Sequence, residues 1–312
     1  MPLFFVNFPM FKYYNSNLIP PIILIASKKS QNKMNVLFQK LYYQFYQRHI
    51  YALTGPIRSL PDFIIIGTVR SGTTSLYSNI CEHPCVLPAA YDELGFFDSN
   101  FHLGLNWYRS LFPTNFSKWY VKRKMKFAIT GEDTPFYIWN PDVAQRILKI
   151  LPNVKLIVLF RNPVDRAYSN YHLGRRDGDE NLSFEDAIQS ELENLKKLEK
   201  NSEKNIEKYT IPRSYVAKGF YSEQLKTWLK LFKREQLFIT STENFELNPQ
   251  ETLNQIFDFL QIPKYEITHP KKYKVASYPK MENETRKFLV NFYKKFNDEL
   301  FELIGKEFDG NK

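Results

Sequence analysis

The chain contains 312 residues, of which 43% are hydrophobic and 16% aromatic, and this composition excludes a largely disordered protein. Its formal net charge of +10 at pH 7 favours anionic partners such as nucleic acid, acidic lipids, nucleotides or acidic sugars. No zinc-finger or RNP-like motif is present, so we expect no nucleic-acid partner.

The two cysteines, Cys81 and Cys85, are too few for a metal site or a disulfide framework, and no second group of Cys or His completes either. We therefore predict that the protein binds no metal. Free thiols are typical of a reducing compartment, and the sequence thus predicts a cytoplasmic location.

Residues 1–60 are predicted to form an N-terminal extension with one helical segment, over 35–51, and residues 1–33 are expected to be loosely held. Within the extension, Leu18–Ala26 is apolar but only nine residues long, and it contains two prolines. A helix that spans a bilayer needs about 20 apolar residues, so we predict no transmembrane segment.

From residue 61 onward, short apolar runs alternate with segments of helical character, and this alternation predicts a single α/β domain over 61–312. The expected strands are Phe63–Ile66, Lys126–Ile129, Lys155–Phe160 and Gln236–Thr240. The expected helices are Thr74–Glu82, Pro141–Leu151, Pro163–Tyr171, Tyr221–Phe232, Pro249–Leu260 and Asn283–Ile304. We expect a central, mainly parallel sheet in a P-loop-like three-layer α/β/α arrangement. Residues 180–210, rich in Glu, Lys and Asn, predict a charged helical insertion or lid, with a solvated surface helix as the simpler interpretation.

The most informative segment is 63–76, where an apolar run stops at a glycine and is followed by hydroxyl-rich, helix-forming sequence. This order predicts a buried strand, a tight loop and a helix N-terminus whose backbone N–H groups can bind an anion. Gly67 and Gly72 have the spacing of a nucleotide-binding P-loop. However, Thr73 stands where the lysine of that loop belongs, and the cation is Arg70, inside the loop. The loop therefore suits an anion without matching the usual Mg-ATP site.

A second anion site is predicted after the third expected strand. Arg161 follows that strand directly, at a place where a P-loop NTPase commonly carries an aspartate for Mg²⁺. Arg166 and Ser169 lie on the next expected helix, and an arginine with a nearby hydroxyl suits a phosphate bound without metal. Two anion sites on neighbouring strands imply a ligand with phosphates at both ends.

Residues 61 to 308 resemble the sulfotransferases that use 3′-phosphoadenosine 5′-phosphosulfate (PAPS), and within them the branch related to the heparan sulfate enzymes. The segment from Arg161 to Ser169 is similar to the family's 3′-phosphate motif, which implies that these two residues hold that phosphate of the donor. The resemblance also implies contacts with the 5′-phosphosulfate for Gly67, Arg70, Ser71, Gly72, Thr73 and Thr74. Arg70 takes the place of the family's usual lysine, which implies a catalytic role in stabilising charge on the leaving phosphate. Lys218-Gly219-x-Tyr221 resembles the family's Gly-x-Tyr step, which implies that Tyr221 contacts the donor.

The segment Tyr91–Asp98 resembles the family's Lys-Glu-x-x-Phe-Phe-Asp motif, whose glutamate is the general base. Glu93 takes this position, which implies that it removes the proton of the acceptor, while Asp92 replaces the lysine. The segment Glu132–Tyr137 resembles a turn near the acceptor. Lys271, Lys272 and Lys274 lie where the family has a loop over the 3′-phosphate, although a solvated run of charges is the simpler interpretation.

The sequence therefore predicts an enzyme that transfers a sulfonate group from PAPS to an acceptor hydroxyl or amine, without a metal. A carbohydrate acceptor is expected because the resemblance is to the glycan-modifying branch. Two alternatives stay open at this point. One is a P-loop kinase or NTPase, which Thr73 and Arg161 disfavour, and the other is a non-catalytic relative that only binds its ligand.

Overall fold

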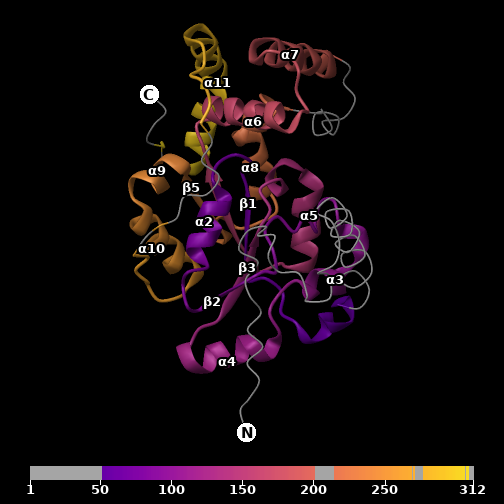
Figure 1. Cartoon of the computed structure of the whole chain (residues 1–312), viewed down its shortest axis with the longest axis vertical. Helices are drawn as coiled ribbons and strands as arrows, with labels where there is room; N and C mark the ends of the chain where they lie inside the picture. The colour runs from indigo at the N-terminus through magenta and orange to yellow at the C-terminus, as the bar shows by residue number, and fades with distance from the viewer. Residues whose placement is uncertain (1–50, 201–213, 269, 271–276, 306, 309–312) are drawn as a thin grey trace, which may run out of the picture.

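The computed structural model describes residues 51–200, 214–268, 270, 277–305 and 307–308 (Figure 1). Most of the predicted N-terminal extension, the end of the charged segment at 201–210, and Lys271, Lys272 and Lys274 lie outside the described residues. The first described element is a short 3₁₀ helix, η2, at Tyr51–Ile57, which packs against α3 at Leu105–Ser110.

The centre of the protein is a five-stranded sheet in the order β2-β3-β1-β4-β5. All neighbouring strands in it run parallel. The strands are β1 (Phe63–Gly67), β2 (Val86–Pro88), β3 (Ile129–Asp133), β4 (Lys155–Phe160) and β5 (Leu237–Ser241). Because the strands are parallel and buried, their carboxyl ends meet at one edge, where ligands of such sheets bind. This confirms the predicted α/β fold.

Helices cover both faces of the sheet and so form the outer two of three layers (Figure 1). Ile64 and Ile66 of β1 pack toward α3, α5 (Pro141–Ile150) and α8 (Tyr221–Leu229). Phe63 and Ile65 of the same strand point to the other face, toward α2 (Thr73–Ile80) and α10 (Pro249–Leu260). This alternation is the two-residue period of a strand that is buried on both faces.

Five further α-helices are described. They are α4 (Asn115–Met125), α6 (Pro163–Asp177), α7 (Phe184–Lys200), α9 (Thr242–Leu247) and α11 (Asn283–Ile304). Among the described helices none is long and apolar enough to cross a membrane.

Two predicted elements differ by more than three residues at one of their ends from the structure. The strand expected at Lys126–Ile129 is β3, at Ile129–Asp133, because Lys126 adopts a left-handed conformation with φ 67° and ends α4. The helix expected at Pro163–Tyr171 continues to Asp177, where Gly178 with φ 78° caps it.

The described part of the charged segment is helix α7, and one of its faces is buried. Phe184, Ile188 and Leu192 contact a cluster that includes residues of α6 and α11. The buried Glu191 accepts hydrogen bonds from the Ser214 hydroxyl and from the backbone N–H groups of 215–217, at 2.6–2.9 Å. The helix therefore organises the chain that leads to Tyr221. Its role as a lid stays a prediction.

Candidate functional site

The last residue of β1, from which the loop starts, is closely packed. A Cβ atom on Gly67 would lie 2.4 Å from the side chain of Ile138, so no larger residue fits there without displacing the turn after β3. Thr68 donates its backbone N–H to the Leu159 carbonyl of β4 at 2.9 Å. Its hydroxyl lies 2.5 Å from that of Ser71, so the predicted ligand residue Ser71 uses its side chain within the loop.

The second half of the loop opens to solvent and leads into helix α2. Arg70 and Gly72 adopt left-handed conformations, with φ 69° and 82°. Gly72 is exposed, and an added Cβ would meet nothing within 4 Å. As the cap of α2, Gly72 supplies no side-chain acceptor to the first turn, which begins with Thr73 and Thr74. A helix N-terminus without such an acceptor suits an anion, because its backbone N–H groups and its dipole both favour negative charge.

The two predicted anion-binding motifs meet at Arg70. Arg161 follows β4, the neighbour of β1 in the sheet, and its Nη1 donates to the Arg70 carbonyl oxygen at 3.0 Å. Arg70 in turn donates its Nε to the Ser169 hydroxyl of α6 at 3.1 Å. Burial lowers the pKa of Arg70, and the nearby Arg161 guanidinium lowers it further, whereas Tyr278 raises it. Two arginines at one point form a positively charged centre that an anion would stabilise.

Helix α9 fixes this junction through residues that the sequence analysis did not single out. The Thr242 hydroxyl donates to the Ser71 carbonyl at 2.7 Å and to the Phe160 carbonyl at 3.0 Å. A Glu243 carboxylate oxygen accepts the backbone N–H of Asn162 at 2.9 Å. A threonine and a glutamate after a strand are common, so their sequence positions carried no specific signal.

Tyr221 and Arg166 lie beneath the same edge. The Tyr221 ring is buried and packs on Phe160, with ring centroids 4.5 Å apart, and it lines a small crevice together with Arg161. Burial raises the pKa of Tyr221. Arg166 is completely buried and donates to the Tyr215 carbonyl, so its side chain is part of the interior and does not extend the open anion site.

The Glu93 segment is anchored to the carboxyl end of β3, which pairs with β1. The Glu93 backbone, with φ 55°, donates its N–H to the Asp133 carbonyl at 2.9 Å, and Gly95 donates to the Thr134 hydroxyl at 3.3 Å. The Glu93 side chain is exposed, as is that of Asp92. The structure therefore brings Glu93 to the edge of the sheet that carries the loop, with its carboxylate accessible.

A second carboxylate on this side, Glu132, is buried inside β3, whereas the sequence analysis placed it after the strand. Its oxygens accept the Tyr108 hydroxyl at 2.5 Å and the Thr134 hydroxyl at 2.8 Å. Burial raises its pKa to about 7, and both hydrogen bonds oppose that shift. The hydroxyl of Thr134 thus links Glu132 to the backbone of the Glu93 segment.

Lys218 provides a cation on the same side of the site. Its ammonium lies 5.3 Å from the centroid of the Phe136 ring, in the turn after β3 that packs against Gly67. The pKa of Lys218 is lowered to about 8, mainly by burial and also by the nearby Arg166, whereas Glu191 opposes the shift. The sequence motif around Lys218 predicted a role for Tyr221. It did not predict where the Lys218 ammonium lies, because that depends on contacts with distant segments.

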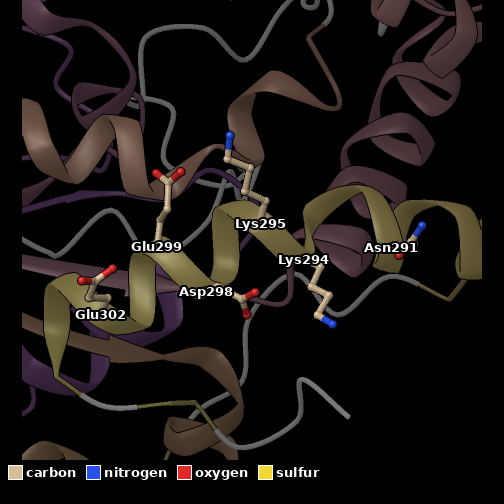
Figure 2. A pocket seen from close by; sticks show the side chains of 6 residues that line it. All are labelled: Asn291, Lys294, Lys295, Asp298, Glu299 and Glu302. Atoms are coloured by element: carbon tan, nitrogen blue, oxygen red, sulfur yellow. The ribbon is translucent and has the colours of Figure 1, made fainter.

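A hollow of about 440 Å³ lies away from these residues, along α11 (Figure 2). Both signs of charge line it, and Glu299 is paired with Lys226 of α8 at 2.7 Å. Its side chains all come from one helix, and none of the predicted site residues is among them: Asn291, Lys294, Lys295, Asp298, Glu299 and Glu302.

Comparison with known proteins identifies the family of the chain that carries this site. The family model described as a sulfotransferase domain matches residues 60–299, which include the loop, Glu93, Arg161, Ser169 and Tyr221. The chain belongs to the sulfotransferase family. This membership decides against the P-loop kinase and NTPase alternative.

Individual relatives of the chain agree with the match. The membrane-associated sulfotransferase kil1 of Dictyostelium discoideum is 29% identical, over 81% of this chain and 67% of its own length. The human bifunctional heparan sulfate N-deacetylase/N-sulfotransferase 2 is 28% identical over 79% of this chain, and the match covers 30% of that protein. The crystal structure of a sulfotransferase from Alicyclobacillus acidocaldarius superposes with a TM-score of 0.61, at 26% identity, over 81% of this chain and 99% of that one.

Proposed function

We propose that the protein transfers a sulfonate group from PAPS to a hydroxyl or amine, and that the acceptor is a carbohydrate. The observation that carries the proposal is the junction at Arg70, where Arg161 donates to the Arg70 carbonyl and Arg70 donates to Ser169. It joins the loop after β1 to the motif after β4, so that one ligand with two anionic ends can contact both.

The residues at the junction fit such a donor. The N-terminus of α2, which lacks a side-chain cap, and the Arg70 guanidinium suit the phosphosulfate end. Arg161 and Ser169 suit a phosphate through charge-assisted and hydroxyl hydrogen bonds. The donor supplies the sulfonate on an anhydride whose S–O bond breaks as the new bond to the acceptor forms. Arg70 and the first turn of α2 then stabilise the charge that develops on the phosphate.

Glu93 is the proposed general base, because its exposed carboxylate can accept the proton that the acceptor loses. General-base catalysis of this kind contributes typically about 10²–10⁴-fold. The carbohydrate acceptor is supported by the names of the heparan sulfate relatives, which modify a glycan. A cytoplasmic location stays a prediction from the cysteine content alone.

Binding and transfer should be measured separately. Adenosine 3′,5′-bisphosphate should raise the melting temperature without Mg²⁺, whereas Mg-ATP should have little effect. The protein should then be incubated with labelled PAPS and a panel of glycans, lipids and phenols. Transfer to a glycan supports the proposal, and transfer only to a lipid or phenol would refute the acceptor class.

A non-catalytic binding protein is the second candidate, because Arg70 and Asp92 replace two lysines expected from the family resemblance. Binding of the bisphosphate without transfer to any acceptor would favour it. Absence of bisphosphate binding would contradict the transfer reaction and any non-catalytic protein that binds the donor, and it would leave only a protein that binds a glycan.

A further inference from the structure

Helix α4 lies at the amino-terminal edge of the sheet, opposite the loop after β1, at the bottom of Figure 1. Its attachment is through Lys118, which pairs with Asp62 at 2.6 Å. Asp62 directly precedes β1, and its carboxylate also accepts the backbone N–H of Thr130 in β3 at 2.8 Å. The start of the helix is fixed by Thr114, whose hydroxyl accepts the N–H of Ser117. The helix is thus firmly placed.

The outer face of α4 is aromatic, although none of the residues of this helix is buried. Phe116 is 71% exposed and Trp119 is 52% exposed, and their rings are stacked with centroids 5.6 Å apart. Tyr120 on the same helix and Phe127 after it are also exposed. Large apolar side chains gathered in one exposed region mark an interaction surface, because their contact with water is unfavourable.

Cations are interleaved with these rings. The Arg123 guanidinium lies 5.7 Å from the Trp119 ring centroid, and the Lys124 ammonium lies 4.5 Å from that of Tyr120. Lys122 and Lys126 are exposed as well, and residues 115–126 contain no Asp or Glu. A helix face that combines aromatic rings with Lys and Arg is typical of the boundary between water and anionic lipid headgroups.

We propose that the outer face of α4 docks on a membrane surface that carries anionic lipid headgroups. Phe116 and Trp119 enter the headgroup boundary, while Arg123 and Lys124 contact the phosphates. Docking through this edge leaves the opposite edge, with Arg70, directed away from the membrane and accessible to soluble substrates. The proposal goes beyond the proposed function and does not depend on it.

Other occupants of this face are disfavoured by charge and by chemistry. Residues 1–50 of the chain contain Lys and Arg but no Asp or Glu, so they cannot neutralise the cations of α4. A second copy of the chain, with a net charge of +10, would be repelled. A soluble sulfated polyanion such as heparin could contact Arg123 and Lys124, but it would leave Phe116 and Trp119 largely in water.

The test is sedimentation of the full chain with vesicles of phosphatidylcholine alone or mixed with phosphatidylserine. We expect binding to the mixed vesicles only, and weaker binding at high salt. The double variant R123Q/K124Q should bind roughly 5-fold more weakly for each cation removed. The double variant F116S/W119S should also lose binding although all its charges remain. The emission of Trp119, measured as the difference between the native protein and W119F, should shift to shorter wavelength on the mixed vesicles.

The matched control is K149Q/K230Q, which removes two exposed lysines from α5 and from the end of α8. It should bind vesicles like the native protein, and all variants should keep the native melting temperature. Three results would overturn the proposal: no preference of the native protein for phosphatidylserine, an equal loss in the control, or native binding by F116S/W119S. Tight binding of heparin or RNA through Arg123 and Lys124 without vesicle binding would likewise refute the lipid surface.

Discussion

The side of the site proposed to bind the donor is bound into the fold, whereas the proposed base on the acceptor side, Glu93, is an exposed side chain. The loop after β1 is tied to β4, α6 and α9 through Thr68, Arg70 and Ser71. Glu93, in contrast, is held through its backbone N–H, and its side chain is exposed. Binding of an invariant donor depends on fixed geometry, and recognition of a particular acceptor depends on side chains that can change without affecting the core. Asp92, which departs from the family motif and reverses the charge, fits this division, whereas the departure at Arg70 on the donor side keeps the positive charge.

The largest effect should follow from Glu93→Gln, because it removes the proposed base and leaves the backbone contacts of the segment in place. We expect turnover to fall by about 10²–10⁴-fold. Affinity for adenosine 3′,5′-bisphosphate should stay unchanged, which isothermal calorimetry measures. Glu235→Gln, an exposed carboxylate before β5, is the control. Near-normal turnover in Glu93→Gln would refute the assignment of the base.

Glu132 should make stability depend on pH. Its pKa is about 7 in the folded state and about 4.5 in the unfolded chain, so the folded state binds more protons between these values. The stabilisation is therefore complete below about pH 4.5 and is lost as pH rises through about 7, by roughly 3 kcal/mol in all. Glu132→Gln lacks this titration. In urea unfolding, the free energy of unfolding of the variant relative to that of the native protein should therefore be higher at pH 8 than at pH 5. Parallel pH profiles of the two proteins would contradict the buried, titrating carboxylate.

Arg161→Ala should weaken the donor side without affecting the chemistry at Glu93. A charge-assisted hydrogen bond contributes about 1.5–3 kcal/mol, so the Kd for adenosine 3′,5′-bisphosphate should rise roughly 10- to 150-fold. Arg161→Lys keeps the charge but not the two-pronged geometry, and it should recover only part of the affinity. Arg123→Ala, at the opposite edge of the sheet, should bind the bisphosphate normally. An unchanged Kd in Arg161→Ala would place the phosphate elsewhere.

The arrangement of the segments around Arg70 could be predicted from the sequence because local patterns determine most of it. The apolar run into Gly67 and the proline after Asn162 mark where β1 ends and where α6 begins, and parallel strands then bring Arg161 beside the loop. The contacts made by Thr242 could not be predicted, because they depend on the register of β5 and the sequence does not specify that register. Hydrogen bonds between distant segments have no local signature.

The acceptor side was predicted less well for the same reason. The end of β3 was missed because Glu132 and Asp133 are charged, and their burial depends on partners such as Tyr108, 24 residues away along the chain. Helix α4 was missed because it buries none of its residues and so has no apolar face directed at the core. Both errors arise where tertiary contacts, or their absence, override the hydrophobic pattern.

We expect the smallest effect at Lys218. If its ammonium contacts an anionic group of a substrate, the proposed acceptor side also contains a contact that the fold holds in place. Lys218→Met keeps most of the side-chain volume and removes the charge, and we expect kcat/KM to fall by about 10-fold. Because burial lowers the pKa of Lys218 to about 8, the native rate should decline as pH rises through that value. Lys218→Arg retains its charge at higher pH and should move this decline upward, whereas Lys230→Met should leave it in place. A decline that is identical in the native protein and in Lys218→Arg would mean that another group titrates, and the acceptor side would then depend on Glu93 without a neighbouring cation.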